Sequence, residues 1–305
     1  MSPLERYLTE LRDTTRPVVM SKLARLSELS PEETEVFKRE WPGIDVARRR
    51  QIVERLTELV EDNFDLDFKV VCFSCLSDSD SEVRVKAIEG LWLYEERSLI
   101  DPLVNLLLKD ESYTARAAAA NALGKFTLLA ELGKLSSSDT RKIEAALLNA
   151  FNKENEHTNV RCKALEAISS LNNPQVEKII RRAYQSNIFE FQVSAIYAMG
   201  QNCNRGWLPV LLKELHSLNA QLKFEAVEAC AKLEAEEAVP RLIELVKDDD
   251  PEVQMSAIEA LGHIGSDEAL EALRKCLDSG EEHIRKMAQE ALDEIRLWED
   301  PFNLY

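Results

Sequence analysis

The sequence predicts an all-α fold, a right-handed α-solenoid of about seven to eight helix-turn-helix repeats. The main observation is the motif apolar-x-x-x-Ala-x-x-Ala, which recurs at a constant period towards the end of the chain. Its second position falls at Gln192, Lys223, Gln254 and Arg285, each 31 residues after the one before. A fixed period between about 20 and 50 residues indicates stacked structural units. Glycine and proline are also sparse, at 9 and 10 of 305 residues, as long helices require.

One repeat shows how the local sequence produces a helix, a tight turn and a second helix. Apolar residues within 236–247 follow helical spacing and would form one buried face. Asp250 can cap a new helix, with Pro251 at its first position, where the missing N–H costs little. Gly265 can end this helix in a left-handed conformation, and Ser266 can cap the next one.

The same pattern extends backwards and gives seven clear repeats between residues 65 and 296. In each second helix a polar residue, numbered zero here, precedes an alanine by three positions. These zero positions are Arg84, Arg116, Arg161, Gln192, Lys223, Gln254 and Arg285. The interval from Arg116 to Arg161 is 45 residues, about 14 too long. We therefore expect an insertion near 128–139, between two repeats.

The two ends of the chain depart from the repeat. Residues 1–64 predict four irregular helices, and we interpret them as an N-terminal cap with a degenerate first repeat, because end repeats must cover an otherwise open face. The predicted helices are 4–11, 18–29, 31–40 and 46–60. Residues 65–296 form the repeat array. The apolar residues of 297–305 favour a C-terminal cap or tail over a docking peptide.

The net charge of −17 is concentrated near the C-terminus. Residues 1–60 carry 11 basic and 11 acidic side chains, whereas residues 234–300 carry 7 basic and 20 acidic ones. A phosphate backbone attracts dense lysine and arginine, so the charge argues against nucleic acid as a partner. The one basic cluster, Arg48 to Arg50, is interpreted as a solvated helix start, with an anion site as the alternative.

The sequence gives no sign of a membrane protein. No apolar run approaches the roughly 18 residues of a membrane span, and the first residues contain no apolar segment typical of a signal peptide. The six cysteines are irregularly spaced within helical patterns, as expected for reduced thiols. We therefore expect a cytoplasmic protein without a membrane partner.

The repeats of this chain resemble a known family. The stretch 248–265 (DDDPEVQMSAIEALGHIG) is similar to HEAT-like repeats, in particular the short type found in phycobilin lyases. The resemblance covers about residues 65–296. It implies a solenoid, and it leaves the function open, because such repeats serve as scaffolds, adaptors and a few enzymes.

The resemblance also implies a polar ladder between repeats. Family members often place aspartate before the turn and arginine at the zero position. The pairs Asp80 with Arg84 and Asp110 with Arg116 fit this pattern. Gln192, Lys223 and Gln254 depart from it, so we expect the ladder to be broken in the C-terminal half.

The fifth position after zero should remain exposed, because positions three, four, six and seven form the apolar face. The resemblance implies that second helices line a concave surface. The residues at this position are Glu89, Asn121, Glu166, Tyr197, Glu228, Glu259 and Glu290. We predict that the first six bind a partner, a protein or peptide held on the concave face, and the glutamates favour a basic one.

The alternative interpretation is that these glutamates only pair locally. Each has a partner at helical spacing, and such pairs contribute about 0.2–0.5 kcal/mol each. The predicted pairs are Lys86–Glu89, Lys163–Glu166, Glu228–Lys232, Glu259–His263 and Lys286–Glu290. Local pairing would partly neutralise an acidic surface.

The two exceptions at the exposed position point to a functional region. Asn121 lies among alanines beside the expected insertion, and Tyr197 lies near further aromatic residues, and exposed aromatics are favoured in interfaces. Phe189 and Phe191 are each expected to fill the core. Together these observations favour residues 112–202 as the region that differs from the repeat because it binds.

Signals of catalysis are weak. Cys72 and Cys75 form a lone CxxC, and a zinc site needs about four ligands, so buried thiols explain the pair better. Deoxyhypusine hydroxylases, which resemble this fold, bind iron through His-Glu pairs, and none of the four histidines is followed by glutamate. No phosphate loop or nucleophile elbow occurs. We therefore predict no catalytic residue, metal or cofactor, and a non-catalytic scaffold or adaptor.

Two other functions remain open. A lyase-like protein that holds a cofactor or tetrapyrrole is the main alternative, supported by the phycobilin lyase resemblance and the aromatics near 184–197. A HEAT-like DNA glycosylase is disfavoured by the negative charge.

Overall fold

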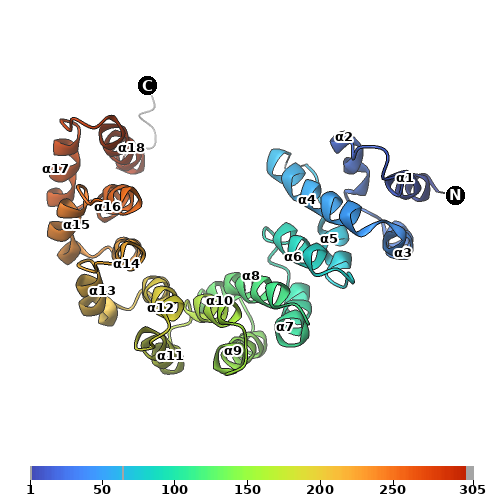
Figure 1. Ribbon diagram of the computed structural model, residues 1–305, viewed down its shortest axis with the longest axis horizontal. Helices are drawn as coiled ribbons and strands as arrows, with labels where there is room; N and C mark the ends of the chain where they lie inside the picture. Colours follow the sequence, from blue (N-terminus) through green and yellow to red (C-terminus); the bar gives the residue numbers. More distant parts are fainter. Residues whose placement is uncertain (1, 64, 300–305) are drawn as a thin grey trace. The chain divides into compact units, whose positions relative to one another are not determined.

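A computed structural model describes residues 2–63 and 65–299, and within them the chain consists of helices joined by short turns (Figure 1). The α-helices and 3₁₀-helices are, in order, α1 (Pro3–Leu11), α2 (Met20–Leu23), η1 (Ala24–Leu26), α3 (Pro31–Glu40), η2 (Trp41–Gly43), α4 (Val46–Asp62), α5 (Lys69–Cys75), α6 (Ser81–Gly90), η3 (Arg97–Leu99), α7 (Ile100–Lys109), α8 (Tyr113–Glu131), α9 (Ser137–Asn152), α10 (Thr158–Ile168), α11 (Pro174–Tyr184), α12 (Phe189–Asn202), η4 (Arg205–Trp207), α13 (Leu208–Glu214), α14 (Ala220–Lys232), η5 (Glu236–Ala238), α15 (Val239–Leu245), α16 (Pro251–Ile264), α17 (Asp267–Cys276) and α18 (Glu282–Glu299). The predicted all-α repeat fold is confirmed.

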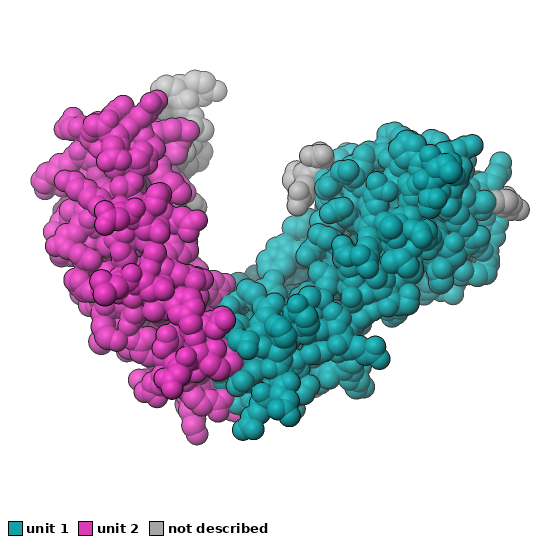
Figure 2. All heavy atoms as spheres, in the orientation of Figure 1, with its two compact units in different colours: residues 1–168 teal, residues 169–305 magenta. Residues whose placement is uncertain are grey.

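The chain divides into two compact units, coloured separately in Figure 2. Unit 1 is Met1–Ile168 and unit 2 is Ser169–Tyr305. The division falls between α10 and α11, and therefore between two helical hairpins rather than inside one. The predicted C-terminal cap at 297–305 lies mostly outside the described residues.

Within each unit the helices form two layers (Figure 1). The second helices of successive hairpins contact one another directly, α4, α6, α8 and α10 in unit 1 and α12, α14, α16 and α18 in unit 2. The first helices, α3, α5, α7 and α9 or α11, α13, α15 and α17, form the other layer. We call the outward side of the second helices the second-helix surface of each unit.

The capping residues behave as the sequence predicts. The Asp250 side chain accepts from the backbone N–H groups of Glu252 and Val253, with Pro251 in the first turn of α16. Gly265 ends α16 with a left-handed φ of 61°. Ser266 then accepts from Ala269 and begins α17. These local bonds satisfy helix-end groups that would otherwise lack partners, which fixes where each helix starts and stops.

Three glycines let neighbouring second helices approach closely. Each glycine lies eight residues after the zero position of its own helix. It faces an alanine of the next second helix, and that alanine lies six residues after the zero position there. A Cβ on Gly124 would lie 3.3 Å from Ala167 Cα, and one on Gly262 would lie 3.1 Å from Ala291 Cβ. At Gly200 the distance to Ala229 Cα would be only 2.8 Å. The helix spacing in each unit therefore depends on the missing side chain.

The surplus residues do not form a separate loop. They lengthen α8 to 19 residues and α9 to 16, and residues 132–136 suffice to join the two helices. The expected insertion near 128–139 is therefore mostly helical. Helical extension satisfies the backbone groups of the added residues internally, which a long loop would not.

A polar ladder joins the repeats of unit 1. Arg84 donates to both oxygens of Asp110 at 2.7 and 2.6 Å, and Arg116 donates to Glu156 at 3.1 and 2.6 Å. In each case the arginine also donates to the carbonyl six residues before it, in its own turn. Each arginine thus ties its turn to the turn of the following repeat.

The Arg48–Arg50 cluster lies at the start of α4, as expected, but the expectation that it is solvated is wrong for Arg48 and Arg49, because the arginines are part of this structural network. Arg48 and Arg49 are buried, and Arg49 pairs with the buried Asp78 at 2.5 Å. Arg50 donates to both oxygens of Asp80 at 2.9 and 2.6 Å. Burial of a charge requires a partner, and these carboxylates supply it.

The expected break of the ladder in the C-terminal half is also wrong in part. Lys223 forms an ion pair with Asp248. This pair continues the ladder with an ammonium group in place of a guanidinium group. Gln254 replaces the charge with a neutral contact, since its Oε1 lies 2.7 Å from His283 Nε2. Gln192 keeps the contact with its own turn, donating to Ser186 O at 2.9 Å.

Candidate functional site

The residues predicted to bind a partner all remain accessible on second helices. Among the six, Glu89, Asn121 and Glu259 are exposed, whereas Glu166, Tyr197 and Glu228 are partly exposed. Glu290 at the same repeat position is exposed as well. They belong to two units, with Glu89, Asn121 and Glu166 in unit 1 and the others in unit 2.

Part of the predicted local pairing is present. Three ion pairs form as expected, Lys86–Glu89 at 3.1 Å, Lys163–Glu166 at 2.6 Å and Lys286–Glu290 at 3.6 Å. Glu228 instead accepts from Ser256 Oγ at 2.5 Å, which links α14 to α16. The pairs of Glu89 and Glu290 are exposed and contribute little free energy, whereas the Glu166 side chain is only 17% exposed.

Asn121 is exposed beside small side chains on the second-helix surface of unit 1. Ala117 and Ala120 beside it are buried, and the Gly124–Ala167 contact brings α8 and α10 together without intervening side chains. The Asn121 amide is short and the alanines around it are buried, so this part of the surface offers a partner little apolar area. Asn121 therefore does not lie in a pocket that could anchor a partner side chain.

The second-helix surface of unit 2 carries apolar side chains that were not predicted. Phe189 is 38% exposed and Met255 is 40% exposed, while Val193 and Phe224 are partly exposed. Val193, Phe224 and Met255 occupy one repeat position, the first after zero, on α12, α14 and α16. In unit 1 this position holds the partly exposed Val85 and the buried Ala117 and Cys162. A scan of this position along the repeats could have found the difference.

The aromatic residues near Tyr197 divide between core and surface. Phe191 is buried, as expected, but the expectation that Phe189 fills the core is wrong. Tyr197 presents its ring to Lys232 of α14, whose ammonium lies 5.0 Å from the ring centroid. This cation–π contact leaves the ring on the surface between α12 and α14.

A groove of about 600 Å³ lies between α16 and α18 on the same surface. Its lining includes four glutamates, Glu234, Glu259, Glu290 and Glu294, with His263 beside them. Gly262 and Ala291, together with Met287, provide apolar lining. The groove therefore combines apolar contact with a negative field, which suits the stem and the head of a basic side chain.

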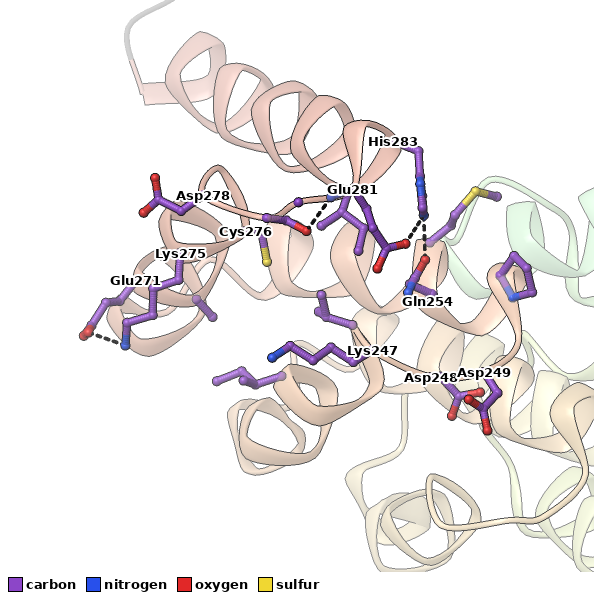
Figure 3. Close-up of a pocket in the computed structure, with 18 of the residues that line it drawn as sticks. Lys247, Asp248, Asp249, Gln254, Glu271, Lys275, Cys276, Asp278, Glu281 and His283 are labelled. Carbon is purple, nitrogen blue, oxygen red and sulfur yellow. Dashed lines mark hydrogen bonds and ion pairs between the residues drawn. The ribbon is translucent and has the colours of Figure 1, made fainter.

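A larger cavity of about 1250 Å³ lies at the turns of the last two hairpins of unit 2 (Figure 3). His283 points towards Gln254, and its Nε2 also lies 3.7 Å from a carboxylate oxygen of Glu281. Cys276 lines the wall, and burial raises the pKa of its thiol. A thiol with a raised pKa is a poor nucleophile, so the lining residues do not form an activated Cys–His pair.

The two cysteines of the CxxC pair fit a structural role. Cys72 and Cys75 are buried, and burial raises the pKa of Cys72 to about 12 and that of Cys75 well above its ordinary value. Within residues 2–63 and 65–299, no three His, Cys, Asp or Glu side chains are grouped so that they could hold a metal ion. The helices described there are all too short or too polar to cross a membrane.

Comparison with known proteins supports the repeat assignment. The model of HEAT repeats matches residues 71–146 and 208–293, together more than half of the chain. No curated protein matches the sequence significantly. Among solved structures the fold is similar to Kap95p, seen with RanGDP, at 13% identity over 95% of this chain and 45% of that chain, with a TM-score of 0.54.

Two further solved structures share parts of the fold at lower similarity. One is the CpcE–CpcF complex of phycocyanin lyase from Nostoc sp. PCC7120, at 19% identity over 64% of this chain and 76% of that chain, with a TM-score of 0.45. The other is YibA of E. coli, at 17% identity over 83% and 98%, with a TM-score of 0.46. The repeat period, the paired helices and the matching family model agree, and the chain belongs to the HEAT repeat family.

Proposed function

We propose that this protein is a non-catalytic scaffold or adaptor that binds a protein or peptide on its second-helix surfaces. The observation that supports this most directly is the accessibility of the fifth position after zero. Every second helix from α6 to α18 presents a side chain there, and five of the seven are glutamates. Within each unit, carboxylates on packed helices form a preorganised surface for a basic partner.

The architecture supports binding rather than chemistry. The ladder contacts and helix caps hold the second helices at fixed spacing, while the thiols of the CxxC pair, Cys72 and Cys75, are buried and have raised pKa values. Kap95p, which shares the fold, is described in complexes with RanGDP and Nup1. A stack of hairpins with a surface of this kind is therefore suited to hold an extended partner.

Recovery of partners from the native host tests the proposal. The tagged full chain would be compared with a variant in which Glu89, Glu166, Glu259 and Glu290 are changed to glutamine. A matched variant would change four exposed glutamates of first helices or turns, namely Glu154, Glu244, Glu268 and Glu271. We expect at least one specific partner whose recovery, by quantitative mass spectrometry, falls about tenfold only in the first variant.

Equal recovery of every partner by the three proteins would contradict the proposed surface. The absorbance spectrum of the protein purified from its host would test the lyase-like alternative. A chromophore bound in stoichiometric amount would replace the scaffold function with that one.

A further inference from the structure

The second-helix surface of unit 2 combines apolar and acidic groups in one arrangement. Phe189 and Val193 lie one turn apart on α12, Phe224 lies on α14 and Met255 lies on α16. All four are partly exposed, Phe189 and Met255 the most. We call these four residues the apolar strip. Exposed apolar side chains gathered in one place on a protein mark interaction sites, and phenylalanine and methionine are enriched in interface cores.

The contacts between helices show that the three helices of the strip are direct neighbours, α12 beside α14 and α14 beside α16. Gly200 of α12 packs against Ala229 of α14, so these two helices are in close contact. The hydrogen bond from Ser256 to Glu228 joins α14 to α16 along the same surface. Because Val193, Phe224 and Met255 share one repeat position, each lies one helix spacing from the next, about 8–10 Å.

Carboxylates border the strip. Glu190 and Glu252 are exposed two positions before zero, and Glu228 and Glu259 lie at the fifth position after it. Positions two before and five after zero are seven residues apart and therefore share one helix face. Two lysines of α14 near the strip are engaged, Lys232 with the Tyr197 ring and Lys223 with Asp248. The surroundings of the strip are thus predominantly negative.

We propose that the apolar strip is the docking site for a basic amphipathic α-helix of a partner protein. The proposal rests on the proposed scaffold function and specifies its partner. The apolar face of the helix would cover Phe189, Val193, Phe224 and Met255, and its lysines or arginines would meet the bordering glutamates.

The spacing of the strip favours a helix over an extended peptide. Seven residues of a helix rise about 10.5 Å, close to the spacing of the second helices, so apolar residues at i, i+7 and i+14 can follow the strip. Side chains on one face of an extended chain repeat at about 6.7 or 13 Å. Neither repeat matches the distance of about 8–10 Å between adjacent second helices. A helical partner therefore makes an equivalent contact at each of α12, α14 and α16.

The charge excludes two other occupants of the strip. A second copy of this chain would bring the same glutamates together, and like charges across an interface are costly. An anionic lipid surface would be repelled for the same reason. A basic helix instead replaces these repulsions with attraction.

A binding experiment with synthetic peptides tests the proposal on the full chain. The probe is an amphipathic peptide of about 18 residues, long enough to span three second helices, with leucines in the helical register and lysines elsewhere. Its controls are a scrambled isomer of equal charge and an analogue with glutamate in place of lysine. Fluorescence anisotropy would give the dissociation constants.

The protein variants isolate the strip. Phe224→Lys with Met255→Lys places two cations in it, whereas Leu218→Lys with Leu108→Lys adds the same two charges at exposed leucines of a turn and a first helix. Circular dichroism melting would confirm that both variants fold. We expect the helical-register peptide to bind about tenfold more tightly than its scrambled isomer, and the strip variant to lose about tenfold while the control changes less than about twofold.

Three outcomes would overturn the proposal. These are equal binding of the scrambled isomer, unchanged binding by the strip variant, and tighter binding of the glutamate analogue. If the host partner depends on the glutamates at the fifth position but no peptide distinguishes the strip variant, this inference alone fails. If no host partner depends on the second-helix surface, the scaffold function itself fails.

Discussion

The ion pair between Arg116 and Glu156 shows how single residues hold the stack. The Glu156 side chain is 2% exposed and accepts hydrogen bonds from Arg116, Lys153 and the backbone N–H of His157. Burial alone would raise the pKa of this carboxyl, but the three donors outweigh it and lower the pKa to about 2. The ionised form is therefore strongly preferred in the folded state.

This pKa shift predicts a pH dependence of stability. A carboxyl with a lowered folded-state pKa stabilises the protein fully above its unfolded pKa of about 4.3, and the contribution disappears as the pH falls towards 2. Glu156→Gln should lower the free energy of unfolding by about 1–3 kcal/mol at neutral pH, and the loss should shrink as the pH falls from 5 to 3. Urea unfolding across that range measures it. Glu154→Gln, at an exposed neighbour, should have little effect; a pH-independent loss at Glu156 would contradict the assignment.

At the scale of the helices, close approach sets the geometry of both units. Gly124, Gly200 and Gly262 share one repeat position and face Ala167, Ala229 and Ala291, yet the space for a Cβ differs between them. Alanine is the better helix former by about 1 kcal/mol, whereas an added methyl that meets a neighbouring backbone costs typically 1–3 kcal/mol. The net effect of an added methyl group should therefore range from near neutral to destabilising along the series.

The glycine series gives a graded prediction. Gly200→Ala, with 2.8 Å to the Ala229 backbone, should destabilise by about 1–2 kcal/mol, while Gly124→Ala, with 3.3 Å, should be close to neutral. Gly280→Ala, in the bend before α18, controls for an added methyl group without a contact, because nothing lies within 4 Å of its Cβ position. Thermal and urea unfolding measure the series. Equal effects at positions 124, 200 and 280 would show that helix spacing does not depend on the missing side chain.

Sequence patterns predicted most of the elements for a physical reason. The caps at Asp250, Gly265 and Ser266 depend only on neighbouring residues, so local sequence determines them. The roles of Arg48 to Arg50 depend on partners about 30 residues away or more, and those could not be inferred from local charge. The same holds for Lys223, whose partner Asp248 lies in the next hairpin.

The candidate site was only partly predictable from the sequence. Position counting along the repeat correctly placed Glu89, Asn121 and Glu259 at exposed positions, because helical periodicity fixes which side faces away from the core. Phe224 and Met255 were missed because apolar residues next to a core face are normally assigned to the core. Their exposure depends on the distance between adjacent second helices. That distance cannot be inferred from the repeat period of the sequence.

At the scale of the whole molecule, the two units differ in what their second-helix surfaces present. Unit 1 has buried alanines around Asn121, and its zero-position residues Arg84 and Arg116 are engaged in the ladder. Unit 2 has the apolar strip, the groove between α16 and α18, and the most acidic segment of the sequence. The central claim is therefore that unit 2 provides the principal binding surface, with a partner that is basic and apolar on one face.

Photocrosslinking in the native host tests this claim most directly. A photoreactive phenylalanine analogue would be placed at Phe224, at Met255 or, as a control, at Leu218, in the otherwise unchanged full chain. Residues in contact with a partner should give a discrete covalent adduct on illumination, whereas the fully exposed Leu218 in its turn should not. We predict the same adduct from positions 224 and 255 and none from 218. Adducts from 218 alone, or the same weak background from all three, would contradict the account.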